Sequence, residues 1–254
     1  MITVGIDVGS TATKVVLLDD KKMFSTVKPT GWSPKQAGLN AYQELLVAEG
    51  YREEQIGMIV ATGYGRIALN FAQKVVTEIT CHGRGAAYLV SEADLVIDIG
   101  GQDSKIIKID SDGKVLDFAM NDKCAAGTGR FLQVMGTALG LDVSELATVS
   151  EGQEPVVINN MCTVFAESEV IGLLAQGTGK GAIVAGLHAS IARRMATMAS
   201  RVGSNKKIVF TGGVALNDGV RRSLEAELGQ DIYVSKECQL AGALGAALIG
   251  RETL

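Results

Sequence analysis

The feature that most constrains the fold is a short internal repeat. The segment IDVGSTATK at 6–14 aligns with IDIGGQDSK at 97–105, so that an aspartate, a glycine and a lysine fall at equivalent places in both copies. Branched and apolar residues follow each copy, as is typical of strand–turn–strand hairpins. The repeat therefore predicts two similar halves, each opening with a hairpin whose first strand ends in an acidic residue.

Apolar runs, turn residues and helical spacing extend this pattern to an α/β chain. The first copy predicts three strands and the second copy, over 95–119, three more. Further strands are expected at 58–61, in KIVFTGGV and in IYVS. Helices are expected at 35–49, 126–139, 163–175, about 181–202 and 217–228, and in AGALGAALIG. We predict one domain from 1–90 with 240–254 and a second from 91–239.

Composition excludes several classes of protein. The 254 residues carry a formal net charge of -4 without a basic run, so we expect no nucleic-acid surface. No apolar stretch approaches the ~18 residues of a membrane span. The chain starts in a strand-like run rather than a charged and then apolar leader, so we expect no signal peptide and a cytoplasmic location. Its 31 glycines against 3 prolines indicate many tight turns.

The repeated turns have the chemistry of a nucleotide site. Strand-end carboxylates such as Asp7 and Asp98 suit a magnesium ion, and glycine turns offer backbone N–H groups to phosphate oxygens. We interpret the two halves as holding a nucleotide in a cleft between them. The candidate phosphate-binding residues are Gly9, Ser10, Thr11, Ala12, Thr13, Lys14, Gly100, Gly101 and Gln102.

One such turn alone is a weak signal, because ordinary hairpins also use glycine. A third glycine motif, TGGVALN at 211–217, strengthens the interpretation. Competing nucleotide motifs are not matched: no segment fits G-x-G-x-x-G, and Gly179-Lys180 is followed by Gly181 rather than Ser or Thr.

Together the three segments resemble the phosphate-1, phosphate-2 and adenosine motifs of the superfamily of acetate kinase, sugar kinases, large heat-shock chaperones and actin. The resemblance implies a duplicated ribonuclease-H-like fold with ATP between the domains, and Asp7 and Asp98 flanking the magnesium. Gln102 is our candidate for orienting the attacking water. The candidate adenosine-binding residues are Gly212, Gly213, Val214 and Asn217, and Gln239 is a further candidate for binding the nucleotide.

Two cysteines, Cys124 and Cys162, each precede a predicted helix. A helix N-terminus lowers a thiol's pKa and favours an anionic centre such as a thiolate-bound iron–sulfur cluster. One chain offers two such cysteines, so a symmetric dimer would supply four. From the local sequence alone, two buried or capping cysteines without metal are the better reading. Cys81 and Cys238 are interpreted as core packing.

The phrases ATGYGR, VIDIGGQD, NDKCAAGTGRFL, CTVFAESEV and TGGVALN extend the resemblance to nearly the whole chain. The chain is similar to the activator of 2-hydroxyacyl-CoA dehydratases, of the BadF/BadG/BcrA/BcrD-type ATPases that include benzoyl-CoA reductase subunits. The resemblance implies one 4Fe–4S cluster per homodimer, held by Cys124 and Cys162 of both chains and oxygen-sensitive. It also implies electron transfer from ferredoxin or flavodoxin to an iron–sulfur dehydratase, benzoyl-CoA reductase-like or double-cubane-cluster partner.

Two other functions remain open: a small-molecule kinase of the same superfold, and a regulatory ATP-dependent binding protein. Both would lack the brown colour of a cluster. Near the second cysteine, Glu167 and Glu169 are either functional or, as the simpler reading has it, part of a solvated helix start. His82 and His188 are interpreted as structural histidines rather than ligands.

Overall fold

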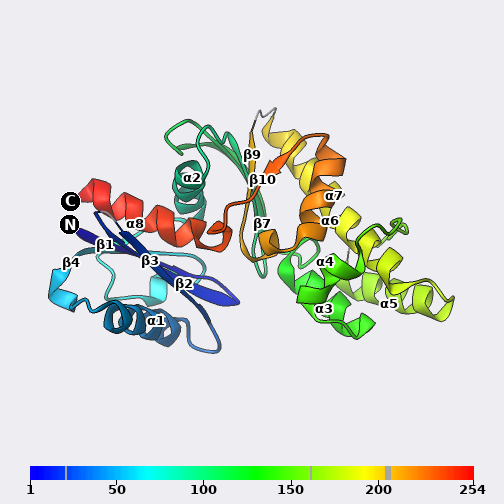
Figure 1. Cartoon of the computed structure of the whole chain (residues 1–254), viewed down its shortest axis with the longest axis horizontal. Helices are drawn as coiled ribbons and strands as arrows, with labels where there is room; N and C mark the ends of the chain where they lie inside the picture. Colours follow the sequence, from blue (N-terminus) through cyan, green and yellow to red (C-terminus); the bar gives the residue numbers. More distant parts are fainter. Residues whose placement is uncertain (21, 161, 204–206) are drawn as a thin grey trace. The chain divides into compact units, whose positions relative to one another are not determined.

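The computed structural model describes residues 1–20, 22–160, 162–203 and 207–254. The chain divides into two compact units (Figure 1). Unit 1 comprises Met1–Val96, Ile107–Asp117 and Ser235–Leu254, and unit 2 comprises Ile97–Ile106 and Phe118–Val234. The predicted domains, 1–90 with 240–254 and 91–239, stay a prediction.

The first sheet has five strands in the order β3-β2-β1-β4-β5. Strand β1 runs antiparallel to β2 and parallel to β4, so the predicted hairpin forms and a fourth strand extends the sheet from its other side. The strands are β1 (Ile2–Val8), β2 (Ala12–Asp19), β3 (Lys22–Pro29), β4 (Ile56–Thr62) and β5 (Lys74–Val75).

Helices cover both faces of this sheet. Successive side chains of β2 point to opposite faces, and both sets are buried. Val15 and Leu17 pack in one core cluster with residues of α1 (Pro34–Glu49). Val16 and Leu18 pack in a different cluster with residues of α8 (Ala241–Thr253). The predicted helices at 35–49 and in AGALGAALIG are confirmed.

Helix α2 (Glu78–Leu89) was not predicted. Its glycines lower helix propensity and mask the spacing of its apolar residues. The structure explains one of them: a Cβ on Gly85 would overlap the carbonyl of Ala241, so the glycine lets α2 approach α8 closely.

The second sheet repeats the strand order of the first. Its order, β10-β9-β6-β7-β8, places the strand of the second acidic turn centrally, as β1 is in the first sheet. This matching order confirms the predicted duplication. The strands are β6 (Leu95–Ile99), β7 (Ser104–Ile109), β8 (Val115–Asn121), β9 (Ile208–Thr211) and β10 (Ile232–Tyr233), the last shorter than the IYVS prediction.

The four helices predicted in unit 2 form, but one of them starts later than predicted, and the short helix α4 (Leu146–Val149) was not predicted. Helix α3 begins at Gly129 and not at 126, because Gly127 has a φ of +79° and Thr128 is extended, which α-helical backbone cannot accommodate. Helices α3 and α5 contact each other, and so do α6 and α7. The helices are α3 (Gly129–Leu139), α4 (Leu146–Val149), α5 (Thr163–Ala175), α6 (Lys180–Val202) and α7 (Asp218–Leu228).

Short 3-10 turns connect these elements, at Glu53–Gln55, Arg66–Ala68, Val143–Glu145, Gly213–Leu216 and Cys238–Leu240. Across the part of the chain that the structure describes, none of the helices has the length and apolar character needed to cross a membrane.

Candidate functional site

In unit 1, the first acidic turn places a buried carboxylate beside a lysine. Asp7 lies near the end of β1 with 3% of its surface exposed. Its Oδ2 is 3.1 Å from Nζ of Lys14, which β2 places opposite Asp7 in the hairpin. The turn closes through the amide of Gly9, which donates to the carbonyl of Ala12 at 3.1 Å.

Threonine hydroxyls brace this turn from β2 and from the residue after β3. The Thr30 hydroxyl donates to the carbonyl of Gly9 at 2.8 Å and lies 3.0 Å from the hydroxyl of Thr13. Thr13 is therefore a buried turn support, whereas Ser10 and Thr11 keep part of their surface exposed. Of the three predicted hydroxyl residues, Ser10 and Thr11 are the ones that a ligand in solvent can reach.

In unit 2, the second turn has the same backbone and a denser set of side-chain contacts. The amide of Gly100 donates to the carbonyl of Asp103 at 2.9 Å, as Gly9 does to Ala12. Lys105, 2% exposed, contacts Oδ2 of Asp98 at 3.2 Å and Oδ2 of Asp103 at 3.0 Å. The Thr211 hydroxyl donates to Oδ1 of Asp98 at 2.9 Å.

A second part of the duplication had been missed in the sequence. A Thr-Gly pair lies at the end of the strand next to the acidic strand in each unit: Thr62 ends β4 and Gly63 follows it, and Thr211 ends β9 and Gly212 follows it. Both glycines have left-handed φ values, +84° and +89°. A Cβ on Gly63 would collide with the Asp7 carboxylate, and one on Gly212 would lie 2.9 Å from Oδ1 of Asp98. Each carboxylate therefore needs a glycine beside it.

The third motif forms the turn between β9 and α7. Val214 is buried in the 3-10 turn, and Gly213 is exposed. Asn217 caps α7, with its Oδ1 accepting from the amide of Val220 at 3.1 Å. Its Nδ2 is buried without a hydrogen-bond partner among the described residues. A buried donor of this kind suits the acceptor atoms of a base or ribose, so the geometry fits the predicted adenosine contact.

The two predicted glutamines belong to different units. Gln102 is exposed in the turn of unit 2 that follows Asp98, and Gln239 is half-buried in the 3-10 turn that precedes α8 in unit 1. Their roles in orienting water and in binding nucleotide stay predictions.

The two cysteine loops both belong to unit 2 and differ in geometry. Cys162 is exposed and is the N-cap residue of α5, as predicted. Cys124 is half-buried in the segment between β8 and α3, and the later start of α3 puts it five residues before the helix. Cys124 thus precedes a helix as predicted, but at a greater distance than the predicted start at 126 implied, because Gly127 and Thr128 form a turn first.

The Cys124 loop is held by a side chain at the end of β8, and the helix that follows it is bonded to the second acidic turn. The Asn121 amide donates to the carbonyls of Cys124 and Ala126, at 2.8 and 3.2 Å. The first amides of α3, those of Gly129 and Arg130, donate to the carbonyls of Gly100 and Gly101 at 2.9 and 2.8 Å. A displacement of that turn would therefore act directly on the helix that follows Cys124.

The two cysteine loops offer two thiols that are at least partly exposed, those of Cys124 and Cys162. Among the described residues, no group of three or more His, Cys, Asp or Glu side chains gathers as a ligand set. A cubane held by four thiolates would take Cys124 and Cys162 from each of two copies. The N–H groups at the start of α5 would favour its negative charge at Cys162.

The other cysteines and the two histidines are buried. Cys81 and Cys238 are fully buried, as predicted. Burial raises the pKa of the Cys81 thiol to about 12. His188 is buried, with Nδ1 3.2 Å from the Ser150 hydroxyl, and burial together with the charge of Arg222 lowers its pKa to about 4.

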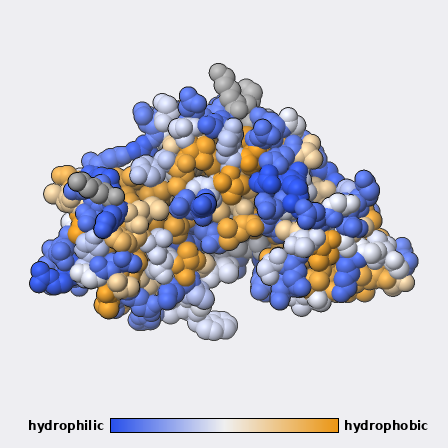
Figure 2. Space-filling model, viewed as in Figure 1, coloured by the Kyte–Doolittle hydropathy of each residue, from blue (hydrophilic) through white to orange (hydrophobic). Residues whose placement is uncertain are grey.

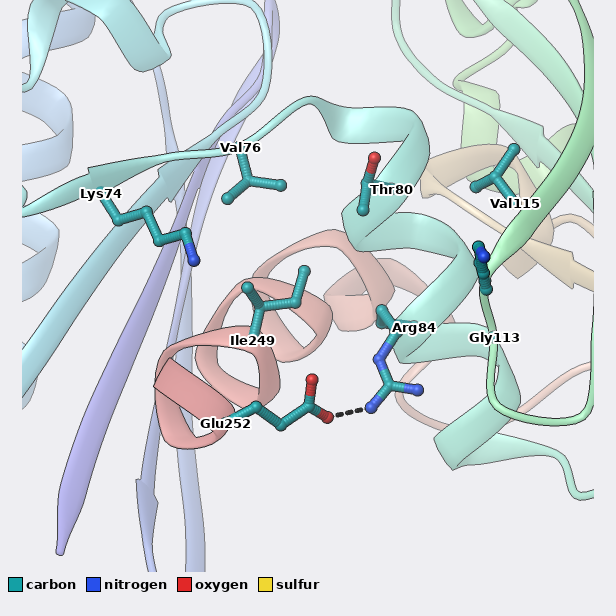
Figure 3. A pocket seen from close by; sticks show the side chains of 9 residues that line it. Lys74, Val76, Thr80, Arg84, Gly113, Val115, Ile249 and Glu252 are labelled. Atoms are coloured by element: carbon teal, nitrogen blue, oxygen red, sulfur yellow. Dashed lines mark hydrogen bonds and ion pairs between the residues drawn. The ribbon is translucent and has the colours of Figure 1, made fainter. Parts of the chain in front are cut away.

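A cavity of about 450 Å³ lies within unit 1, away from the predicted site residues (Figure 3). Its walls carry Lys74, Arg84 and Lys114, with Glu252 paired to Arg84. Lys74 also donates to the Thr253 hydroxyl at 3.0 Å. Two of its three basic groups thus already have partners within the wall.

The family was determined by comparison with known proteins. Residues 4–250 match the BadF/BadG/BcrA/BcrD ATPase family. The chain belongs to this family. It is 46% identical over 97% of its length to the (R)-2-hydroxyglutaryl-CoA dehydratase activating ATPase of Acidaminococcus fermentans, covering 95% of that protein.

Solved structures agree with the family and with the fold class. The activator of the 2-hydroxyisocaproyl-CoA dehydratase from Clostridium difficile, solved with bound ADPNP, superposes with a TM-score of 0.94 at 42% identity, over all of this chain and 95% of that one. A ROK family glucokinase from Streptomyces griseus superposes with a TM-score of 0.58 at 13% identity, over 99% of this chain and 100% of that one. The latter likeness shows the duplicated actin and sugar-kinase fold alone.

Proposed function

We propose that this ATPase-family chain is a cytoplasmic activator that hydrolyses Mg-ATP to pass one low-potential electron to a partner enzyme. In this proposal a homodimer holds one 4Fe–4S cluster through Cys124 and Cys162 of each chain. The donor is a ferredoxin or flavodoxin. The acceptor is an iron–sulfur enzyme of the 2-hydroxyacyl-CoA dehydratase, benzoyl-CoA reductase-like or double-cubane type.

The duplicated acidic turns support the nucleotide part of the proposal. In each unit a buried aspartate is held by a lysine beside a glycine turn, and backbone amides of such turns are common donors to phosphate oxygens. We assign Asp7 and Asp98 to magnesium, the two turns to phosphate, and Gln102 to the attacking water. The unpartnered amide of Asn217 supports an adenosine role for the third motif.

The single observation that carries the cluster assignment is the exposed thiol of Cys162 at the start of α5. Three apolar side chains of this helix are also exposed: Val164 at 66%, Phe165 at 64% and Ile171 at 53%. Hydrophobic residues on the surface in the region of α5 are visible in Figure 2. A second copy that brings its own pair of thiolates would cover this apolar surface.

The link between the two sites supports coupling within unit 2. The carbonyls of Gly100 and Gly101 accept from the first amides of α3, and the Cys124 loop immediately precedes that helix. A bound phosphate that draws the turn toward itself would pull on α3, and its loss would release the helix. When bound, the cluster supplies a one-electron redox centre.

The experiment is anaerobic reconstitution with iron and sulfide. We expect a brown dimer with about four irons per dimer. The variants Cys124→Ser and Cys162→Ser should lose colour and iron while keeping ATP hydrolysis, whereas Cys81→Ala should keep both. Colourless wild-type protein, or a Cys162→Ser variant with full iron content, would contradict the cluster assignment and favour a kinase or regulatory role.

A further inference from the structure

Helix α5 carries two glutamates close to its start, and their surroundings differ. Glu167 and Glu169 are both half-buried. Glu169 accepts four hydrogen bonds, whereas the structure records no hydrogen bond or ion pair of the Glu167 carboxylate with other described residues. Two acidic residues of one helix are thus expected to do different things.

The four donors to Glu169 come from two consecutive asparagines that precede Cys162. The amide and side-chain nitrogens of Asn159 donate to Oε1 at 3.0 and 2.9 Å. Those of Asn160 donate to Oε2 at 3.0 and 2.8 Å. Each carboxylate oxygen therefore holds one residue by both its backbone and its side chain.

This geometry requires an ionised carboxylate. Four donors face two oxygens, and a proton on either oxygen would add an O–H donor that competes with the N–H donors facing it. Although burial works toward a higher value, the hydrogen bonds from Asn159 and Asn160 hold the pKa of Glu169 below its usual range. The arrangement is not the solvated helix start that was the simpler sequence interpretation.

The position of the held segment gives it consequences for the thiol. Ile158 is buried, and the chain then emerges to the exposed Cys162 at the N-cap of α5. Val156 donates its amide to the carbonyl of Ala182 on α6, which fixes the segment from its other side. Between Ile158 and Cys162, the contacts with Glu169 hold the two residues before Met161 against α5.

We propose that Glu169 is a positioning residue that clamps Asn159 and Asn160 to α5 and so presents the Cys162 thiolate to the shared cluster. The inference rests on the proposed function for its cluster part. The clamp itself is a property of the iron-free chain. Glu169 acts through the segment it holds and does not contact the reacting atoms.

The test compares Glu169→Gln with the matched change Glu167→Gln on the same helix. A glutamine offers one acceptor oxygen and an NH₂ group that opposes the remaining donors, so at least two of the four hydrogen bonds are lost. In the iron-free protein, we expect hydrogen exchange of the Asn159 and Asn160 amides to speed up about tenfold or more in Glu169→Gln, since one lost charge-assisted hydrogen bond contributes ~1.5 kcal/mol or more. Glu167→Gln should leave that exchange unchanged.

The second readout is the rate at which an iron chelator removes iron from the anaerobically loaded protein. We expect Glu169→Gln to release iron several times faster than wild type and Glu167→Gln to match wild type. Equal exchange and equal iron release in the two variants would overturn the proposal. If wild-type protein takes up no iron, the cluster assignment and the presentation of Cys162 to it fail, while the exchange measurement still decides whether Glu169 holds the loop.

Discussion

The acidic turn of unit 1 and that of unit 2 share a backbone and differ in what surrounds it. Both close through the same glycine amide, and both set an aspartate beside a lysine and a left-handed glycine. In unit 2, however, Asp103 gives Lys105 a second carboxylate, whereas Ala12 stands at that place in unit 1. Thr211 donates to Asp98, whereas Thr62 lies beside the thiol of Cys81.

The comparison divides the residues of the repeat into those suited to bind a ligand and those that stabilise the fold. The shared parts, a carboxylate and a glycine turn, are what suits a magnesium–phosphate group. The unshared parts are compensations for burial. Lys105 is 2% exposed and needs carboxylate partners, while the side chain of Lys14 is 15% exposed and retains some water.

The largest expected difference in unfolding free energy between the two turns comes from their lysines. Lys105→Met leaves Asp98 and Asp103 without their buried cation, so we expect it to cost about 3–5 kcal/mol of unfolding free energy. Lys14→Met should cost about 1–3 kcal/mol, because water reaches that site. Urea unfolding of the nucleotide-free variants measures both. Equal losses would mean that the extra carboxylate in unit 2 has no energetic role.

The paired threonines sharpen the same comparison. Thr211→Val removes a hydrogen bond to a buried carboxylate, and we expect a loss of about 1.5–3 kcal/mol. Thr62→Val keeps the shape of a side chain that faces a neutral thiol and should cost less than about 1 kcal/mol. The two unfolding midpoints, compared at one pH, decide the matter. A larger loss for Thr62→Val would reverse our assignment of the two hydroxyls.

Acid should destabilise unit 2 more than unit 1, because His188 belongs to unit 2. Its pKa in the fold is lowered from 6.5 to about 4, so it is neutral there, whereas the unfolded chain binds a proton below 6.5. Stability contributed by the neutral ring is therefore complete above pH 6.5 and falls as the pH drops toward 4. Between pH 8 and pH 5 the loss is about 2 kcal/mol.

Hydrogen exchange locates this loss. Protection should decline first in α6 and α7 and remain longer in α1 of unit 1, and His188→Asn should remove the pH dependence assigned to the ring. A decline that begins in α1, or an unchanged pH profile in His188→Asn, would show that other groups govern acid sensitivity.

Much of the fold could be predicted because the repeat and the apolar runs act locally. The run Val15–Leu18 buries alternate residues on two faces, and the strand periodicity reveals this directly. Helix α2 escaped prediction because one of its glycines, Gly85, allows close contact with α8, a partner more than a hundred residues away in the sequence. Propensity carries no information about such a contact.

The candidate site, too, was predictable where its features are local in the sequence and not where they depend on three-dimensional contacts. Asp7, Asp98 and the glycine turns were identifiable from the repeat, and the Thr-Gly pairs were a signal that could have been found in the same way. The start of α3 was misplaced because the left-handed conformation of Gly127 is not evident from spacing. The clamp on Glu169 depends on four donors that converge only in three dimensions.

We propose that both acidic turns take part in binding Mg-nucleotide, although their surroundings differ. Titration calorimetry with Mg-ADPNP tests it most directly, using Asp7→Asn, Asp98→Asn and the exposed control Asp231→Asn. We predict that each of the first two weakens binding about 10- to 100-fold and that the control binds as wild type does. A folded Asp7→Asn or Asp98→Asn protein with wild-type affinity would contradict the account.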